Sequence, residues 1–452
     1  MADQGQLLST PVWFWLPGRT QPELAADLRS EGNASRWLYR QNYLDHPSWQ
    51  APDPVQLGRV NRTKGVLISD ADRLPGVLRD AAPAGYGADR LDAQAGRELR
   101  PLERLELGPA DGVGALEASH NVERKLEWRP RALTELEALA RELDEEAPSS
   151  RAIRRLQDGH ATSAGGERPK VTVHADGRWW LAKMRDRSDI PWLPAKEFVA
   201  MSLARDLPEN SGDGVDLRAP EFRYVQAGAH AIFLIERFDR VGADGTALLP
   251  GDAPARLPFA SAHTALRLRL DAVAGDPGRS YLALADELRR WGRNSPWLDG
   301  DVAELWRRMT TNALVGNSDD HPRNHGFLFE GGHWRLAPLF DVTPVANEAV
   351  VLRMAVGVDG SAIPSVERLL VAASHFGVDV EEGAAWLAAK SRFIAQNWQR
   401  RLRELGVPDV EIERTAPAFA LSEELASSPL LLDEACEAVK QQLNRRRRRP
   451  VG

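Results

Sequence analysis

Three oxygen-bearing side chains suited to metal and phosphate chemistry lie between residues 316 and 344. Asp319 is followed five residues later by Asn324, and Asp341 closes the stretch. Carboxylate and amide oxygens are hard ligands that suit Mg²⁺ holding nucleotide phosphates. With Asn324 and Asp341 as metal ligands, Asp319 is left to act as a base or orienting group for an attacking hydroxyl. The alternative is an ordinary surface turn, since Asp, Asn, His and Gly are also common in turns.

A predicted β-hairpin brings these residues together. Residues 327–330 and 333–336 are short apolar runs joined by two glycines, the pattern of a tight hairpin. Antiparallel pairing across the loop places Asn324 opposite Leu339, two residues before Asp341. An Asp and an Asn five residues apart on a loop, followed by a metal-binding Asp, is the set of groups with which protein kinases transfer phosphate.

Length and composition fit a folded protein with more than one packed unit. The chain has 452 residues, 43% of them apolar, which is enough for two or three units and a large core. The net charge of −7 gives no general attraction to nucleic acid, and no run of about 18 apolar residues predicts a membrane span. Cys436 is the only cysteine, which excludes a multi-cysteine zinc site and fits a cytoplasmic location.

The apolar pattern predicts strands in the first part of the chain and mainly helices in the second, an α+β fold. Two hairpins are expected, formed by residues 171–174 with 179–183 and by residues 222–226 with 231–238. Helices are expected over residues 133–144, 194–207 and 381–405. Arg129-Pro130 marks an expected domain boundary, because the proline interrupts the chain.

A phosphate-binding loop and its lysine are expected around the first hairpin. Gly165 and Gly166 can let main-chain amides approach a phosphate, and Lys183 ends an apolar strand shortly afterwards. Glu197 follows on the next predicted helix, in position for the lysine–glutamate pair with which kinases orient phosphates. The alternative is an ordinary glycine loop and an exposed lysine at a strand end.

Residues 235–239 end an apolar strand where the strand-rich and helical parts meet. A strand end there can offer main-chain groups to the edge of an adenine and Phe238 to its face. Glu236 and Asp239 are assigned to the same nucleotide site. The alternative is an ordinary strand end with solvated charges.

Together these segments resemble the HipA family, the bacterial serine/threonine kinase toxins of type II toxin–antitoxin modules. The most specific similarities are the N-x-D-x-H-x-x-N loop and the ERFDR segment. The segments that carry the resemblance are 163–170, 235–240, 317–324 and 339–341, with 74–80 and 112–116 in the N-terminal part. Two departures are Arg168-Pro169 in place of more polar residues and His325 in place of a frequent aromatic.

The resemblance implies a two-lobed kinase-like fold with an added N-terminal subdomain. The expected parts are residues 1–130, the N-terminal subdomain; 131–240, the kinase N-lobe; and 241–452, the helical C-lobe. The cofactors are ATP and Mg²⁺, with Asp319 as catalytic base, Asn324 and Asp341 on the metal, and Lys183 and His321 on the nucleotide. Ser163 lies where the family carries an inactivating autophosphorylation serine.

Two functions follow from the resemblance. The first is a kinase toxin that phosphorylates a cytoplasmic protein, with an aminoacyl-tRNA synthetase as the candidate, and that pairs with an antitoxin of the HipB type. The second is a catalytically idle nucleotide-binding regulator that reaches DNA only through such a partner. The retention of Lys183, Asp319, Asn324 and Asp341 favours the first. A lipid kinase is disfavoured, because the sequence has no basic amphipathic membrane stretch, and no helix-turn-helix pattern predicts direct DNA contact.

Overall fold

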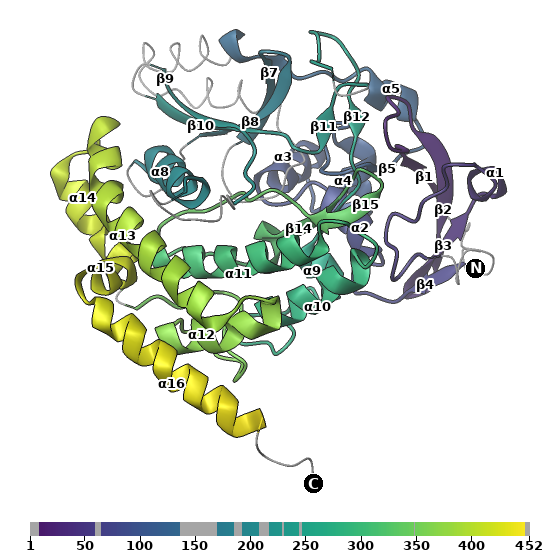
Figure 1. The fold of residues 1–452 in the computed structure, drawn as a ribbon. Coiled ribbons are helices and arrows are strands. Elements are labelled where there is room, and N and C mark those ends of the chain that lie inside the picture. The colour runs from purple at the N-terminus through teal and green to yellow at the C-terminus, as the bar shows by residue number, and fades with distance from the viewer. Residues whose placement is uncertain are drawn as a thin grey trace. The chain divides into compact units, whose positions relative to one another are not determined.

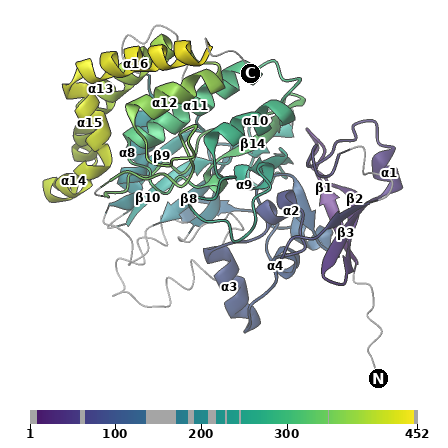
Figure 2. The same ribbon diagram turned by 90° about the horizontal axis from the view of Figure 1, so that it is seen from below.

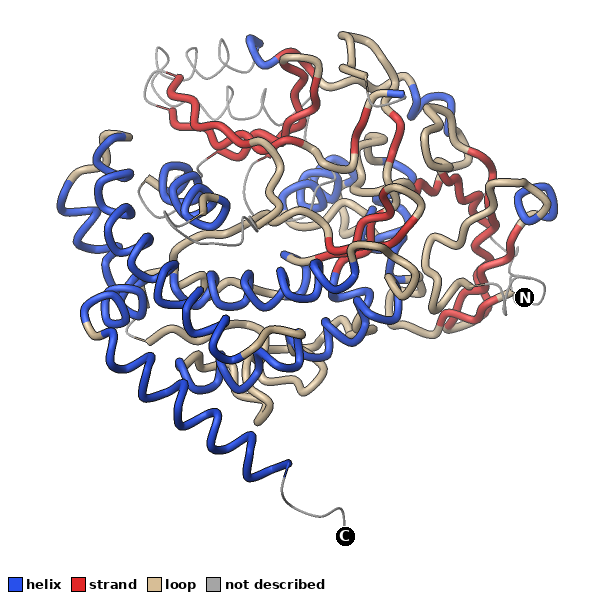
Figure 3. Tube along the Cα trace, in the orientation of Figure 1, coloured by secondary structure: helices blue, strands red, loops and turns tan. Residues whose placement is uncertain are grey.

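The computed structural model describes residues 9–58, 65–135, 170–184, 192–207, 217–227, 230–243, 246–347 and 349–447 (Figure 1). The chain divides into two compact units. The first comprises Met1–Ser188, Glu221–Leu270 and Leu328–Gly332, and the second comprises Asp189–Pro220, Asp271–Phe327 and His333–Gly452. The first unit holds most of the strands, whereas the second is mainly helical (Figure 3). This composition agrees with the predicted α+β class.

The N-terminal part of the first unit is an antiparallel sheet of order β4-β3-β2-β1-β5. Its strands are β1 (Ser9–Phe14), β2 (Glu23–Glu31), β3 (Ala34–Tyr39), β4 (Val66–Ile68) and β5 (Leu116–Ala118). The helices of this part are α1 (Gln41–Leu44), α2 (Gly76–Ala81), α3 (Tyr86–Ala95), α4 (Pro101–Leu107) and α5 (Val122–Leu126). Alternating burial along β1 shows that one face of this sheet covers a core.

A second sheet, of order β6-β7-β8-β10-β9, contains both predicted hairpins. Its strands are β6 (Arg131–Ala132), β7 (Lys170–Ala175), β8 (Arg178–Met184), β9 (Phe222–Ala227) and β10 (His230–Glu236). Asp176 and Gly177, between β7 and β8, have φ values of 49° and 70°, as a tight two-residue hairpin turn requires. Both hairpin predictions are confirmed.

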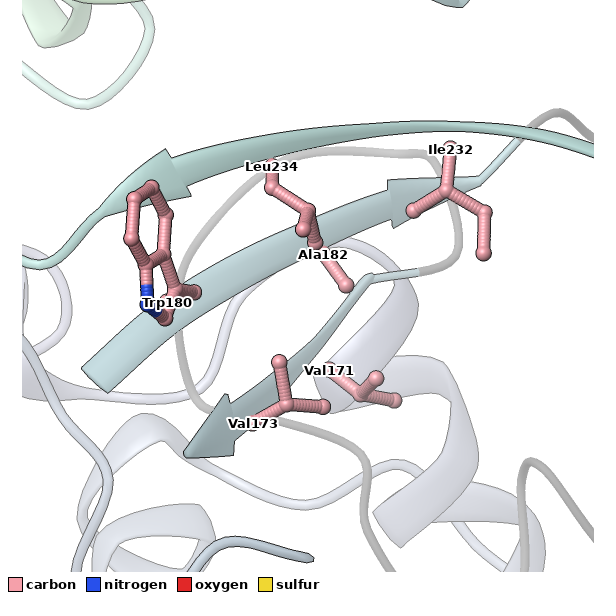
Figure 4. Close-up of a cluster of buried hydrophobic side chains, with 6 residues drawn as sticks. All are labelled: Val171, Val173, Trp180, Ala182, Ile232 and Leu234. Carbon is pink, nitrogen blue, oxygen red and sulfur yellow. The ribbon is translucent and has the colours of Figure 1, made fainter. Parts of the chain in front are cut away.

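One face of this second sheet carries a compact apolar core. Side chains from β7, β8 and β10 gather there, as Figure 4 shows; they are Val171, Val173, Trp180, Ala182, Ile232 and Leu234. Each is almost completely buried. Along β8 the side chains of Trp180 and Ala182 lie in this core, whereas the half-buried Lys183, one residue before the end of the strand, lies on the opposite face. The core therefore fixes the register of the strand that carries this lysine.

The remaining elements of the first unit follow β10. They are β11 (Arg240–Val241), β12 (Ala255–Arg256), β13 (Phe259–Ser261) and α9 (Ala262–Ala265). The Ser261 main-chain N–H and hydroxyl both donate to the Asp80 carboxylate, each at 2.7 Å. This pair of bonds ties α2 to β13 within the unit.

The second unit packs its helices in layers (Figure 2). They are α8 (Leu193–Arg205), α10 (Tyr281–Trp291), α11 (Leu298–Leu314), α12 (Val366–Ala373), α13 (Val380–Glu404), α14 (Asp409–Thr415), α15 (Ala420–Ser427) and α16 (Pro429–Arg447), with the short helices η3 (Pro322–Asn324), η4 (Ser374–Phe376) and η5 (Ala416–Phe419). The helices predicted over 194–207 and 381–405 are confirmed as α8 and α13, whereas most of the predicted helix 133–144 lies outside the described residues.

Two polar features explain how α13 is placed. Asp379 accepts hydrogen bonds from the main-chain N–H groups of Glu381 and Glu382, so it caps the start of the helix. Lys390, buried on the same helix, donates to the carbonyls of Ala204 and Asp206 at 3.0 and 2.8 Å. These carbonyls end α8, where a cation complements the helix dipole.

The predicted Gly-Gly hairpin is present as β14 (Gly326–Glu330) and β15 (His333–Leu336), neighbours in a sheet of order β13-β14-β15. The Ala337 N–H donates to the Gly326 carbonyl at 2.9 Å, which is the same register that was expected to place Asn324 opposite Leu339. No helix in the described part of the chain is long and apolar enough to cross a membrane.

Candidate active site

The loop that carries Asp319 begins where α11 ends. Gly316 has a φ of 61°, and a Cβ atom at this position would collide with the main chain of Ala418. Only glycine avoids both the strained backbone and this contact. The chain therefore turns sharply after α11 and enters the loop at a fixed point.

Main-chain hydrogen bonds between residues two or three positions apart shape the loop around Asp319. The Asp319 carbonyl accepts the His321 N–H at 2.8 Å, and the His321 carbonyl accepts the Asn324 N–H, also at 2.8 Å. The side-chain Nδ2 of Asn324 donates back to the Asp319 carbonyl at 3.1 Å. Residues 319–324 are thereby folded so that a hydrogen bond directly connects the expected metal ligand to the main chain of the expected base.

Asp341 lies beside the same loop. The Nδ2 of Asn317 is 3.5 Å from the Asp341 carbonyl, and the Val345 N–H donates to the Gly316 carbonyl at 3.0 Å. The structure thus brings Asp319, Asn324 and Asp341 into one region of the second unit, as the sequence predicts. Their chemical roles stay predictions.

Asp341 has an unusual backbone. Its φ is 61°, a left-handed conformation that residues other than glycine seldom adopt. Such a conformation costs about 1–3 kcal/mol and is concentrated at functional sites. The side chain of Asp319 is half exposed to solvent, and its Oδ1 lies 3.8 Å from Nη2 of Arg353.

The donor atoms in this region fit Mg²⁺ held together with phosphate. Because Nδ2 of Asn324 is bonded to Asp319, Oδ1 is the atom that Asn324 offers to a cation, and Asp341 adds a carboxylate. Among the described residues, no group of three or more His, Cys, Asp or Glu side chains could hold a metal without other ligands. An ion bound by one carboxylate, one amide, phosphate oxygens and water is typical of Mg²⁺.

The expected nucleotide residues of the first unit occupy β8 and the end of β10. Lys183 pairs in register with Lys170 and Phe233, and its Nζ lies 5.8 Å from the centre of the Phe233 ring. Glu236 ends β10 and accepts a hydrogen bond from Arg178 at 2.9 Å. The Phe238 ring lies 5.9 Å from the Phe259 ring. Nucleotide contact by Lys183, Glu236 and Phe238 stays a prediction.

Other expected residues are less informative. Ser163, Gly165 and Gly166 lie outside the described residues. Glu197 is buried in α8 of the second unit, so its pairing with Lys183 stays a prediction. The Nδ1 atom of His321 is buried without a hydrogen-bond partner, and its contact with a nucleotide also stays a prediction.

Asp239 is the centre of a buried ion network. Its carboxylate accepts bonds from Arg237 at 3.0 and 2.8 Å, from Arg240 at 2.6 Å and from the Gly114 N–H at 2.8 Å. Burial alone raises the pKa of Asp239, but the charges of Arg237 and Arg240 and these bonds outweigh it and hold the pKa well below its usual range. Both oxygens are engaged, which indicates a structural role; nucleotide contact by this side chain stays a prediction.

The partners that complete this network, Asp111 and Thr172, could not be found from the sequence. Arg237 Nη1 also bonds Asp111 Oδ1 at 2.5 Å, and the Thr172 hydroxyl donates to the same carboxylate. Burial lowers the pKa of Arg237, but Asp239 and Asp111 reverse this effect and raise it.

This fold and this loop define the class of protein. The family model described as the HipA-like C-terminal domain matches residues 162–401, more than half of the chain, so the chain belongs to this family. The match includes the expected phosphate loop, the ERFDR segment, the loop of Asp319 and Asp341. The resemblance expected from the motifs is therefore confirmed.

One solved structure shares the fold of this chain over nearly its whole length. HipA of Shewanella oneidensis MR-1, from a toxin–antitoxin complex with HipB and operator DNA, matches 95% of this chain and 99% of its own with a TM-score of 0.67 and 17% identity. This similarity confirms the predicted kinase-like fold class. The proinflammatory kinase CtkA of Helicobacter pylori matches 60% of this chain and 94% of its own, with a TM-score of 0.38 and 12% identity. No curated protein matches the sequence.

Proposed function

We propose that this protein is an ATP- and Mg²⁺-dependent serine/threonine protein kinase of the HipA toxin type. The observation that carries the proposal is the Asn324–Asp319 bond of 3.1 Å in a loop whose first residues also contact the main chain of Asp341. One region thus holds a half-exposed carboxylate, an amide oxygen and a second carboxylate. This set is what phosphoryl transfer from a nucleotide to a hydroxyl requires.

Each group has one role in the proposed reaction. The substrate hydroxyl attacks the γ-phosphorus while the bond to the bridging oxygen breaks and ADP leaves. Asp319 orients the hydroxyl and accepts its proton. Asn324 and Asp341 would hold Mg²⁺, which neutralises phosphate charge when bound. Lys183 would contact the ATP phosphates.

The biological setting is also part of the proposal. The Shewanella relative was solved with HipB and operator DNA, which supports an antitoxin partner of the HipB type that carries the DNA contact. The substrate is then a cytoplasmic protein, with an aminoacyl-tRNA synthetase as the candidate. The idle regulator is the competing function, and it predicts nucleotide binding without phosphoryl transfer.

Phosphoproteomic mass spectrometry tests the proposal. A cell lysate treated with Mg-ATP and wild-type protein should gain phosphoserine or phosphothreonine sites that Asp319→Ala does not produce. Asp299→Ala, which removes an exposed carboxylate from the first turn of α11, is the matched control and should behave as wild type. Equal phosphorylation by wild type and Asp319→Ala would refute the assignment, and nucleotide binding without any new site would favour the regulator.

A further inference from the structure

Five buried polar side chains form one hydrogen-bonded chain beneath the loop of Asp319. They come from α10, α11, the loop itself and the residue that follows η3, and each is at most 2% exposed. They are Tyr281, Asn312, Asn317, Asp320 and His325. The proposed reaction assigns no role to any of them. Burying so many polar groups is costly unless each is bonded.

The directions of the bonds follow from the donors and acceptors. Asn317 Nδ2 donates to Asn312 Oδ1 at 3.1 Å, and Asn312 Nδ2 donates to the Tyr281 hydroxyl at 2.9 Å. The Tyr281 hydroxyl donates to Asp320 Oδ2 in a short bond. Burial, and then the charge of Asp320, raise the pKa of Tyr281 well above its usual range, so its hydroxyl remains a donor.

His325 completes the chain from the other side. Its Nε2 lies 2.5 Å from Asp320 Oδ1 and 3.2 Å from the Tyr281 hydroxyl. The Tyr281 and His325 rings also meet edge to face, with their centres 5.2 Å apart. Since a carboxylate only accepts, the His325 Nε2 atom carries the proton of this bond. Asp320 therefore receives two donors from different segments of the chain.

Through the main chain, the network reaches the three residues Asp319, Asn324 and Asp341 of the candidate site. Asp320 directly follows Asp319, and His325 directly follows Asn324. The Asp320–His325 bond thus joins the residues next to the expected base and the expected metal ligand. At the other end, Asn317 reaches the carbonyl of Asp341 at 3.5 Å.

We propose that Asp320, His325 and Tyr281 are positioning residues that hold Asp319 and Asn324 in the geometry needed for phosphoryl transfer. The inference rests on the proposed kinase function and deepens it. The side chain of Asp319 is half exposed, so its position depends on how the main chain beneath it is anchored. A misplacement of about 1 Å at a reacting group can lower the rate about 100-fold.

Kinetics of three conservative variants test the inference. In Asp320→Asn, His325→Phe and Tyr281→Phe, we expect kcat for phosphoryl transfer to fall about 10- to 100-fold while the KM for ATP changes little, because alignment and not binding is lost. The control is Glu411→Gln, which removes a buried carboxylate of α14 that pairs with Lys196 at 3.7 Å. It should lower thermal stability but leave kcat unchanged. Three variants with wild-type kcat, or a kcat loss in Glu411→Gln that equals theirs, would overturn the inference.

Hydrogen–deuterium exchange provides a measurement that does not depend on activity. The three variants should take up deuterium faster than wild type in peptides covering residues 316–328 and 339–345, whereas Glu411→Gln should not. Faster exchange with an inactive wild type would support the anchoring role and refute the kinase function. Unchanged exchange in these peptides with an active wild type would refute the anchoring role alone.

Discussion

The main-chain N–H of Gly114 donates to the carboxylate of Asp239 at 2.8 Å, although the two residues are 125 positions apart. Gly114 has a φ of 81°, and a Cβ atom there would crowd Phe259 at 3.2 Å. The Gly112 carbonyl, two residues earlier, accepts bonds from Arg237 and Arg240. The main-chain groups of Gly112 and Gly114 therefore bind the charged side chains that follow β10.

This hydrogen bond connects two segments that the sequence analysis assigns to different parts of the protein. Residues 112–116 and 235–240 were both expected from the family resemblance, the first as part of an N-terminal subdomain and the second at a nucleotide site. Within the first unit they form one buried cluster. The cluster joins the N-terminal part to the second sheet, so we expect its loss to act on stability before it acts on chemistry.

Replacing Asp239 by Asn should destabilise the fold strongly. The change leaves Arg237 and Arg240 buried without their shared countercharge, which costs about 3–5 kcal/mol when one member of a buried pair is removed. Asp27→Asn is the control, because Asp27 pairs with the half-exposed Arg40 and its loss should cost about 1 kcal/mol or less. Denaturant unfolding measures both free energies. Equal losses in the two variants would show that the Asp239 network adds little.

The same network predicts a dependence of stability on pH. The folded pKa of Asp239 lies well below its usual range, so the stabilisation is present above about pH 4, the pKa of an unperturbed Asp. It is lost as the pH falls from there toward the folded pKa. The free energy of unfolding of wild type should therefore fall more steeply below about pH 4 than that of Asp239→Asn. Parallel curves would contradict the assigned charge state.

The turns, hairpins and short motifs could be predicted because the residues that determine them are neighbours in the sequence. The Asp176-Gly177 turn, the Gly-Gly hairpin and the spacing of Asp319 and Asn324 are each contained in a few residues. They were expected with nearly the observed bounds. Hydrophobic alternation and turn chemistry act over short distances, so a single sequence contains them.

The tertiary partners were not predictable from one sequence. Tyr281 lies in α10 and Asn312 in α11, and nothing in either helix indicates that its polar side chain meets Asp320. Asp111 likewise has no local feature that points to Arg237, 126 residues away. Such contacts depend on how elements pack, and the apolar pattern that sets the packing says nothing about single polar pairs.

Asp341→Ala should abolish phosphoryl transfer and leave the fold intact, because the proposed metal ligand would be removed. The φ of 61° allows a second measurement. Asp341→Gly should be more stable than Asp341→Ala by about 1 kcal/mol, since glycine adopts this conformation without strain, yet it should be equally inactive. Normal turnover in either variant, or full wild-type activity in excess EDTA, would exclude the metal role. Thermal unfolding and a radiolabelled ATP assay give the two readouts.

Lys183→Ala should weaken productive nucleotide binding. A charge-assisted bond to phosphate contributes about 1.5–3 kcal/mol, or about ten- to a hundred-fold in affinity or rate. Arg131→Ala is the control, because it removes an exposed cation from the edge strand β6 of the same sheet. Calorimetry with ATP and steady-state kinetics should both report the loss. If neither changes, Lys183 is an ordinary strand lysine and has no part in the reaction.

Ser163 should become phosphorylated when the protein is incubated with Mg-ATP, and the proposed kinase activity should then be lost. A phosphoserine adds about −1.5 to −2 charge beside the expected phosphate loop, so it repels the ATP phosphates and can displace the loop. Ser163→Ala should stay active longer than wild type, and Ser163→Asp should be impaired from the start. Ser150→Ala, earlier in the sequence, serves as the control and should lose activity at the wild-type rate.

If Ser163 merely caps a turn before Gly165, the two Ser163 variants would instead behave alike and lose only a little stability. Intact-mass analysis before and after ATP treatment, followed by peptide mapping, separates these outcomes. A phosphate found elsewhere, with Ser163 unmodified in an inactivated sample, would rule out this mechanism.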